Sequence, residues 1–175
     1  MTDRSDTAAF PTPSPDPDAG ETTAGTDTPD LSGTRADRSA VLSAMHRLEA
    51  ACDHAAAQRG GEWCAEVAEA LATLVAALET EHLHADADTG LWAELVAHAP
   101  RLARRVEQLR AEMTELRDEV RSLHDTVTCA PAPTPAEVDG IRVRIGDLLG
   151  RLRLLRAREA DLIHEAWVVD IGGGD

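Results

Sequence analysis

Apolar residues recur at alternating intervals of four and three between residues 102 and 127. They are Leu102, Val106, Leu109, Met113, Leu116, Val120, Leu123 and Val127. This heptad spacing is typical of a long α-helix that buries one side against other helices. The pattern therefore predicts a helix from Pro100 to about Val127, with Pro100 in its first turn.

Two segments before this helix show the same kind of spacing. A first helix is expected from Arg38 or Ser39 to the pair Gly60–Gly61, and a second from about Glu62 to His84. The positions expected to be buried are Val41, Met45, Leu48, Cys52 and Ala55 in the first helix, and Trp63, Val67, Leu71, Leu74 and Leu78 in the second. The stretch Ala85–Pro100 loosens at Gly90, and its apolar part is expected to pack across one end of the helices.

A fourth long helix is expected after the breaker sequence CAPAPTP. Thr134 and Glu137 form a capping box around Pro135, which is a typical helix start. The positions expected to be buried are Val138, Ile141, Ile145, Leu148, Leu152, Leu155, Glu159, Leu162 and Ala166, before the helix stops at Gly172–Gly173–Gly174. Glu159 stands out because a buried carboxylate is costly without a partner.

Four amphipathic helices with mostly short connections predict an all-α protein, an up-down-up-down four-helix bundle over residues 38–171. Residues 1–37 contain almost no large apolar side chains, so we expect a disordered acidic tail. The tail is either inert, which is the favoured interpretation, or read by a partner. Residues 172–175 form a short glycine-rich tail. The segment WVVDIGGGD before the C-terminus either folds back on the bundle or is offered to a partner, and the fold-back is the favoured interpretation.

Composition and charge narrow the classes of partner. The formal net charge of −15 would repel a phosphate backbone or an anionic membrane surface, so we expect neither nucleic-acid nor membrane binding. No apolar run is long enough to span a membrane, no signal core is visible, and the three cysteines (Cys52, Cys64 and Cys129) lack metal-knuckle spacing. These features predict a cytoplasmic protein with free thiols.

The expected helices differ in length. At about 1.5 Å per residue the last two reach roughly 40 to 50 Å, and the first two only roughly 30 to 35 Å. The longer pair therefore needs a cover over its overhanging apolar surface: the tail, the segment around Trp92, or a second subunit. From this we expect a homodimer, or another protein partner, bound through these two helices or through the tails.

The segment VEQLRAEMTELR (Val106–Arg117) resembles the Leu-x-x-Glu-His-x-x-Leu motif of the hemerythrin-like family, with Met113 in place of the histidine. His46 in AMHRL resembles the first-helix ligand of that family, and His82 with Asp86 in HLHAD resembles its His-x-x-x-Glu pair. The stretch that follows, LWAELVAHAP, resembles the family's Leu-Phe-Pro-x-Leu. Over residues 40–165 the resemblance implies a four-helix bundle that holds two irons.

The chain departs from that family at two ligand positions. Met113 carries a thioether, a poor ligand for iron, and the last helix has Leu155 and Arg156 where a histidine is expected. The resemblance then leaves His46, His82, Asp86 and Glu159 as metal candidates. Each has a simpler interpretation: His46 as a boundary residue, His82 as a helix-end cap, and Glu159 as the partner of an arginine on a neighbouring helix.

No phosphate-binding glycine loop or nucleophile elbow is present in the sequence. We therefore expect a non-enzymatic binding or scaffold protein, derived from a hemerythrin-like domain and without a cofactor. The alternative is an iron-binding member of that family that senses oxygen or redox state.

Overall fold

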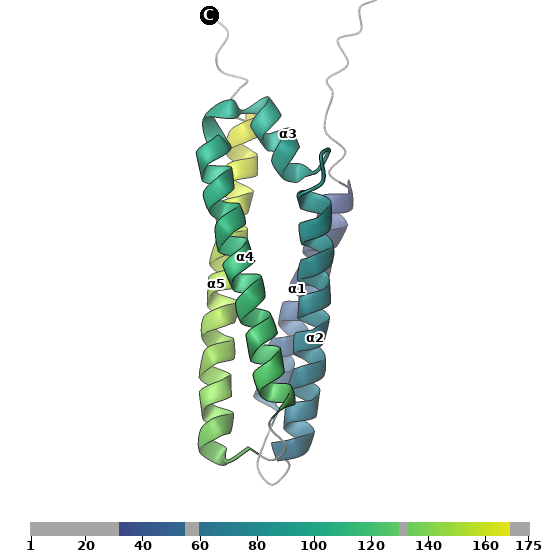
Figure 1. Ribbon diagram of the computed structural model, residues 1–175, viewed down its shortest axis with the longest axis vertical. Coiled ribbons are helices and arrows are strands. Elements are labelled where there is room, and N and C mark those ends of the chain that lie inside the picture. The colour runs from purple at the N-terminus through teal and green to yellow at the C-terminus, as the bar shows by residue number, and fades with distance from the viewer. Residues whose placement is uncertain (1–31, 55–59, 130–132, 169–175) are drawn as a thin grey trace, which may run out of the picture.

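The computed structural model describes residues 32–54, 60–129 and 133–168. All regular elements in this part of the chain are helical, which confirms the all-α class (Figure 1). They are α1 (Ser32–Asp53), α2 (Gly60–Ala85), α3 (Leu91–His98), the 3-10 turn η1 (Pro100–Leu102), α4 (Ala103–Thr128) and α5 (Pro135–Val168). None of the helices in the described ranges is long and apolar enough to cross a membrane.

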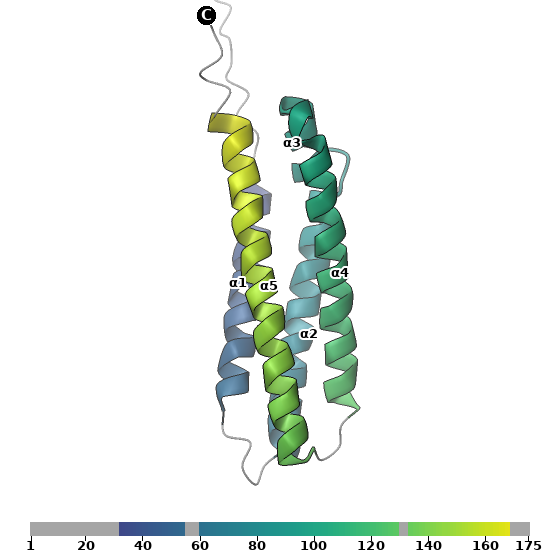
Figure 2. The same cartoon turned by 90° about the vertical axis from the view of Figure 1, so that its left-hand side faces the viewer.

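The long helices α1, α2, α4 and α5 lie side by side, and the short α3 lies at one end (Figures 1 and 2). Ion pairs between α1 and α2 show that these helices run in opposite directions. Asp37 near the start of α1 contacts His84 near the end of α2, whereas Arg47, further along α1, contacts Glu69, earlier in α2.

The heptad positions form one continuous core. Every predicted seam residue of α2, α4 and α5 is buried, including Met113 and Glu159. In α1, Val41, Met45 and Leu48 are buried and Cys52 is half-buried, while Ala55 lies outside the described residues. The sequence pattern thus identified the buried side of each long helix, because burial of an amphipathic helix follows its 3.6-residue period.

The first helix differs from its expected bounds at both ends. It begins at Ser32, before the expected start at Arg38 or Ser39, and ends at Asp53. The pair Gly60–Gly61 opens α2 instead of ending α1. A Cβ atom at Gly60 would lie 3.3 Å from the carbonyl oxygen of Pro133, so the glycine allows the connection before α5 to pass close to this helix start.

The segment around Trp92 packs against α4 and α5 where α4 begins and α5 ends. A Cβ atom at Gly90 would lie 2.4 Å from the carbonyl oxygen of His84, so only glycine lets the chain turn back this tightly over the end of α2. The turn leads into α3, whose Leu91, Trp92 and Leu95 are buried. Of the three covers considered for the overhanging apolar surface, the segment around Trp92 is the one that packs there in the described part of the chain.

The start of α5 has the predicted capping box. The backbone N–H of Thr134 donates to the Glu137 carboxylate at 2.7 Å, and the N–H of Glu137 donates to the Thr134 hydroxyl at 3.3 Å. The pKa of Glu137 is lowered because its carboxylate accepts hydrogen bonds from the backbone N–H and from the hydroxyl of Thr134. The local sequence therefore fixes where this helix begins. The expected end at Gly172–Gly174 and the segment 169–175 lie outside the described residues.

Candidate functional site

Two buried glutamates share one arginine in the interior of the domain. Glu81 on α2 is 6% exposed and Glu159 on α5 is 2% exposed. The guanidinium of Arg156, one turn before Glu159, donates through Nη1 to Glu81 Oε1 at 2.7 Å and to Glu159 Oε2 at 2.8 Å, and through Nη2 to Glu81 Oε2. Two of these charge-assisted hydrogen bonds tie α2 to α5, and the third lies within α5.

A second arginine completes the cluster from α1. Nη2 of Arg38 lies 3.3 Å from Oε2 of Glu159. With all four side chains ionised, the two arginines balance the charges of Glu81 and Glu159. We call these four residues the charge cluster. Their pairing satisfies the rule that a charge taken out of water needs an opposite charge beside it.

Burial and pairing act in opposite directions on the charge cluster. Burial raises the pKa of Glu81 above its ordinary value, and the nearby Arg156 only partly offsets this effect. For Arg156, burial alone would lower the pKa, but the carboxylates of Glu81 and Glu159 raise it above its ordinary value. Arg156 therefore stays charged, and Glu81 is the member of the cluster that gains a proton more readily than a free glutamate.

The burial of Glu159 and its pairing with an arginine were predicted from the sequence, but Glu81 was not among the predicted residues. Glu81 continues the buried stripe of α2, since it follows Leu78 by three residues and precedes Ala85 by four. The same spacing argument that singled out Glu159 would have found it. The expected arginine from a neighbouring helix is Arg38, and Arg156 adds a second one from the same helix.

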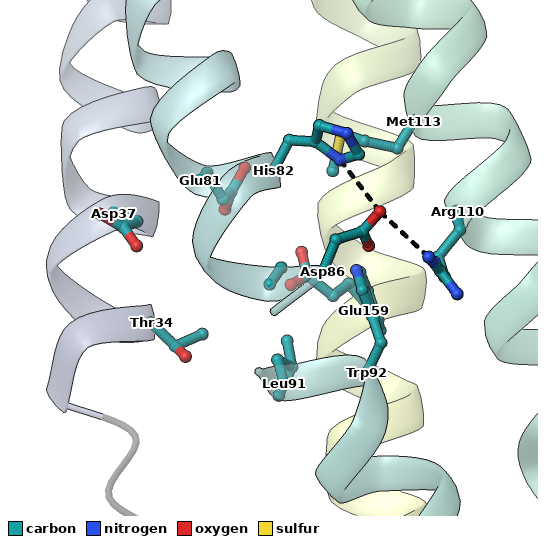
Figure 3. A pocket seen from close by; sticks show the side chains of 11 residues that line it. Thr34, Asp37, Glu81, His82, Asp86, Leu91, Trp92, Arg110, Met113 and Glu159 are labelled. Atoms are coloured by element: carbon teal, nitrogen blue, oxygen red, sulfur yellow. Dashed lines mark hydrogen bonds and ion pairs between the residues drawn. The ribbon is translucent and has the colours of Figure 1, made fainter. Parts of the chain in front are cut away.

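The charge cluster borders a small cleft that also contains the predicted second-helix pair (Figure 3). The cleft has a volume of about 20 Å³, room for about one water molecule. Glu81, His82, Asp86, Met113 and Glu159 are among its lining residues, together with Thr34, Asp37, Ala85, Leu91, Trp92 and Arg110. All five α-helices thus contribute to this one site.

His82 and Asp86 lie together, as their spacing predicts. Nδ1 of His82 is 3.4 Å from Oδ2 of Asp86, and the same carboxylate oxygen accepts a hydrogen bond from Arg110 at 3.0 Å (Figure 3). The neighbouring His84 instead contacts Asp37 at 2.7 Å. Both imidazoles therefore have carboxylate partners at the end of α2.

His46 is the predicted site residue that the structure does not bring to the cleft. Its side chain is exposed on α1 and does not line the cleft. It follows Arg38 by eight residues, which places it about 12 Å further along the helix. Of the four metal candidates, the structure brings His82, Asp86 and Glu159 to one cleft and leaves His46 two turns away.

The donor set around the cleft does not fit a di-iron centre. Glu159 is held by two arginines, Asp86 by Arg110, and Met113 offers a soft thioether where iron prefers nitrogen or oxygen. Within residues 32–54, 60–129 and 133–168, no group of three or more His, Cys, Asp or Glu side chains is arranged to hold a metal ion. Arginine guanidinium groups compensate the charges of the buried carboxylates Glu81 and Glu159.

The cysteines do not add to this chemistry. All three are free thiols, with Cys64 buried, Cys52 half-buried and Cys129 exposed. Burial raises the pKa of Cys52 to about 11, so its thiol is protonated at neutral pH and is a poor nucleophile.

Comparison with known proteins finds no relative. No protein-family model matches the chain, and no curated protein or solved structure matches it significantly. The hemerythrin-like resemblance therefore depends on the residues and motifs of this sequence alone.

Proposed function

We propose that the chain is an up-down-up-down four-helix bundle of hemerythrin-like ancestry that acts as a non-enzymatic binding or scaffold protein. The observation that carries this proposal is the double pairing of Glu159. A carboxylate that the resemblance offers to a metal is neutralised by Arg38 and Arg156. An internal cation removes both the free charge and the space that a metal ion needs.

The surroundings of the cleft support the same proposal. Met113 is only 7% exposed, so it fills the interior as an apolar side chain. A space of about 20 Å³ excludes all but the smallest ligands. Pockets that hold drug-sized ligands are far larger than this cleft, typically about 300 to 1,000 Å³. Binding through the outer surfaces of the helices is therefore the function we favour.

Iron content tests this proposal against the iron-sensor alternative, which the proximity of His82, Asp86 and Glu159 keeps open. The full chain, produced with iron in excess, should contain well under one iron per chain and show no oxo-bridged di-iron absorption. Two irons per chain with such an absorption band would overturn the scaffold proposal.

A variant makes the test sharper. Replacing Arg156 with methionine frees Glu81 and leaves Glu159 with Arg38 as its remaining partner, while a long side chain still fills most of the space. Added Zn²⁺ should therefore raise the melting temperature of Arg156→Met more than that of the unchanged protein. Arg158→Met is the matched control, because Arg158 is an exposed arginine two residues away that pairs with Glu112. Equal zinc responses of the two variants would show that Arg156 does not stand in for a metal.

A further inference from the structure

The outward face of α5 carries apolar side chains that the rest of the described chain leaves uncovered. Val143 is 64% exposed and Leu154 is 51% exposed. Gly146, Gly150 and Ala157 lie on the same side, because the steps along this set are three, four, four and three residues. These five residues, the outer stripe, lie opposite the buried seam, on the helix nearest the viewer in Figure 2.

Packing within the chain does not explain the two glycines of the outer stripe. A Cβ atom added at Gly146 or at Gly150 would meet nothing within 4 Å. Glycine inside a helix is less favourable than any residue except proline, so alanine would be the better choice for an isolated α5. A glycine does, however, let another backbone approach closely. The outer stripe therefore has the shape of a contact with a second helix.

We propose that the outer stripe packs antiparallel against the same stripe of a second copy, about a two-fold axis at Gly150. Gly146 and Leu154 each lie four residues from Gly150, and Val143 and Ala157 each lie seven. A two-fold axis there places Leu154 of one copy over Gly146 of the other, and Val143 over Ala157. Large residues then meet small ones on both sides of the axis, and glycine meets glycine at the axis itself, so the stripe is complementary to its own copy, as a two-fold interface requires.

The charges along α5 are compatible with an antiparallel contact between two copies of this helix. The chain as a whole carries −15, but α5 holds six arginines and six acidic residues, so two copies of this helix meet without net repulsion. Asp147 and Arg151 lie on one flank of the outer stripe, and equal flanks face each other in an antiparallel pair. Each Asp147 then faces Arg151 of the other copy, and Asp147 has no ion-pair partner within the described residues.

This dimer rests on the proposed function, because it identifies a second copy of the chain as one partner of the proposed scaffold protein. A contact through one helix of each copy buries less than the roughly 1,200 Å² typical of stable complexes. The dimer is therefore expected to be reversible and to depend on protein concentration.

Sedimentation velocity of the full chain over a hundredfold concentration range tests the proposal. We expect a monomer at the lowest concentration and a dimer at the highest. Leu154→Arg should raise the dissociation constant at least tenfold, whereas Leu83→Arg, at a 67% exposed leucine on α2, should leave it unchanged. A monomer throughout, or equal effects of the two variants, would overturn the proposal.

Charge reversal tests the orientation. Asp147→Arg and Arg151→Asp should each weaken the dimer, because each places like charges opposite one another, and the double variant should restore it. Restoration would also rule out a trivial effect of losing the contact between Arg151 and Glu119. Failure of the double variant to restore the dimer would overturn the antiparallel arrangement.

Glycine substitutions distinguish an effect on the contact between the two copies from an effect on the stability of a single copy. Gly150→Gln and Gly140→Gln should both raise the melting temperature of dilute protein, since both positions are helical and open. Only Gly150→Gln should weaken the dimer; equal effects on association would contradict the proposed crossing point. Iron content is measured separately: a monomer without iron overturns the dimer alone, whereas an iron-loaded dimer overturns the scaffold function alone.

Discussion

Arg38 on α1 and Glu159 on α5 form an ion pair, with 3.3 Å between Nη2 and Oε2. The side chain of Glu159 is 2% exposed, whereas that of Arg38 is 26% exposed. The first turns of α1 thus supply part of the compensation for a charge in the interior. The cluster therefore depends on a residue at the predicted start of the first helix, directly after the segment whose composition predicts a tail.

This relationship predicts a difference between two N-terminal deletions. Removal of residues 1–31 should leave the melting temperature nearly unchanged, because their composition offers little apolar surface to bury. Removal of residues 1–37 deletes Thr34 and Asp37 and frays the helix at Arg38. This deletion should cost about 1 kcal/mol, or roughly 2–4 °C. Thermal unfolding followed by circular dichroism checks both; equal melting temperatures would show that these turns contribute nothing.

Arg156 should matter far more than its exposed neighbour. Its side chain is 11% exposed and its loss leaves two buried carboxylates underpaired, so Arg156→Met should lower the free energy of unfolding by about 3–5 kcal/mol. Arg158→Met breaks only an exposed pair and should cost less than about 1 kcal/mol. Urea unfolding in the absence of metal gives both values. A loss below about 1 kcal/mol for Arg156→Met would mean that the glutamates relax into water.

Substitutions at Met113 test whether this residue, which takes the place of the histidine in the family motif, is part of the packed core. Met113→Ala should cost about 2–5 kcal/mol by leaving a cavity, and Met113→Leu less than about 1.5 kcal/mol. Met113→His should bury a polar ring and lose stability with or without metal. A rise in the melting temperature of Met113→His on adding iron or zinc would instead show that the remaining ligands are poised, and would favour the iron-sensor alternative.

The raised pKa of Glu81 predicts a pH dependence of stability. A carboxyl group with a higher pKa in the folded than in the unfolded state favours folding most when it is protonated. The contribution of this group to stability is full below its pKa in the unfolded state, about 4.3, and is lost as the pH rises through its pKa in the folded state. The measured quantity is the free energy of unfolding of the unchanged protein minus that of Glu81→Gln. This difference should therefore fall as the pH rises above about 4 and then level off. A difference that rises with pH would mean that pairing with Arg156 outweighs burial.

The sequence alone determined the helical class and the buried side of each long helix. The spacing of Val106, Leu109 and Met113 fixes a face, because side chains three and four residues apart share one side of a helix. Burial of Glu159 followed from the same period. The start of α5 was also readable, since Thr134 and Glu137 cap it within four residues.

Only the tertiary structure decided which side chains meet across helices. Glu81 joins Arg156, and Arg38 joins Glu159, because of the register and rotation of α1, α2 and α5 against one another. The heptad period fixes neither of these, since it is a property of each helix separately. For the same reason the apolar spacing did not predict the start of α1 at Ser32. The first turns of this helix lack an apolar pattern of their own, and they contact α2 and α5.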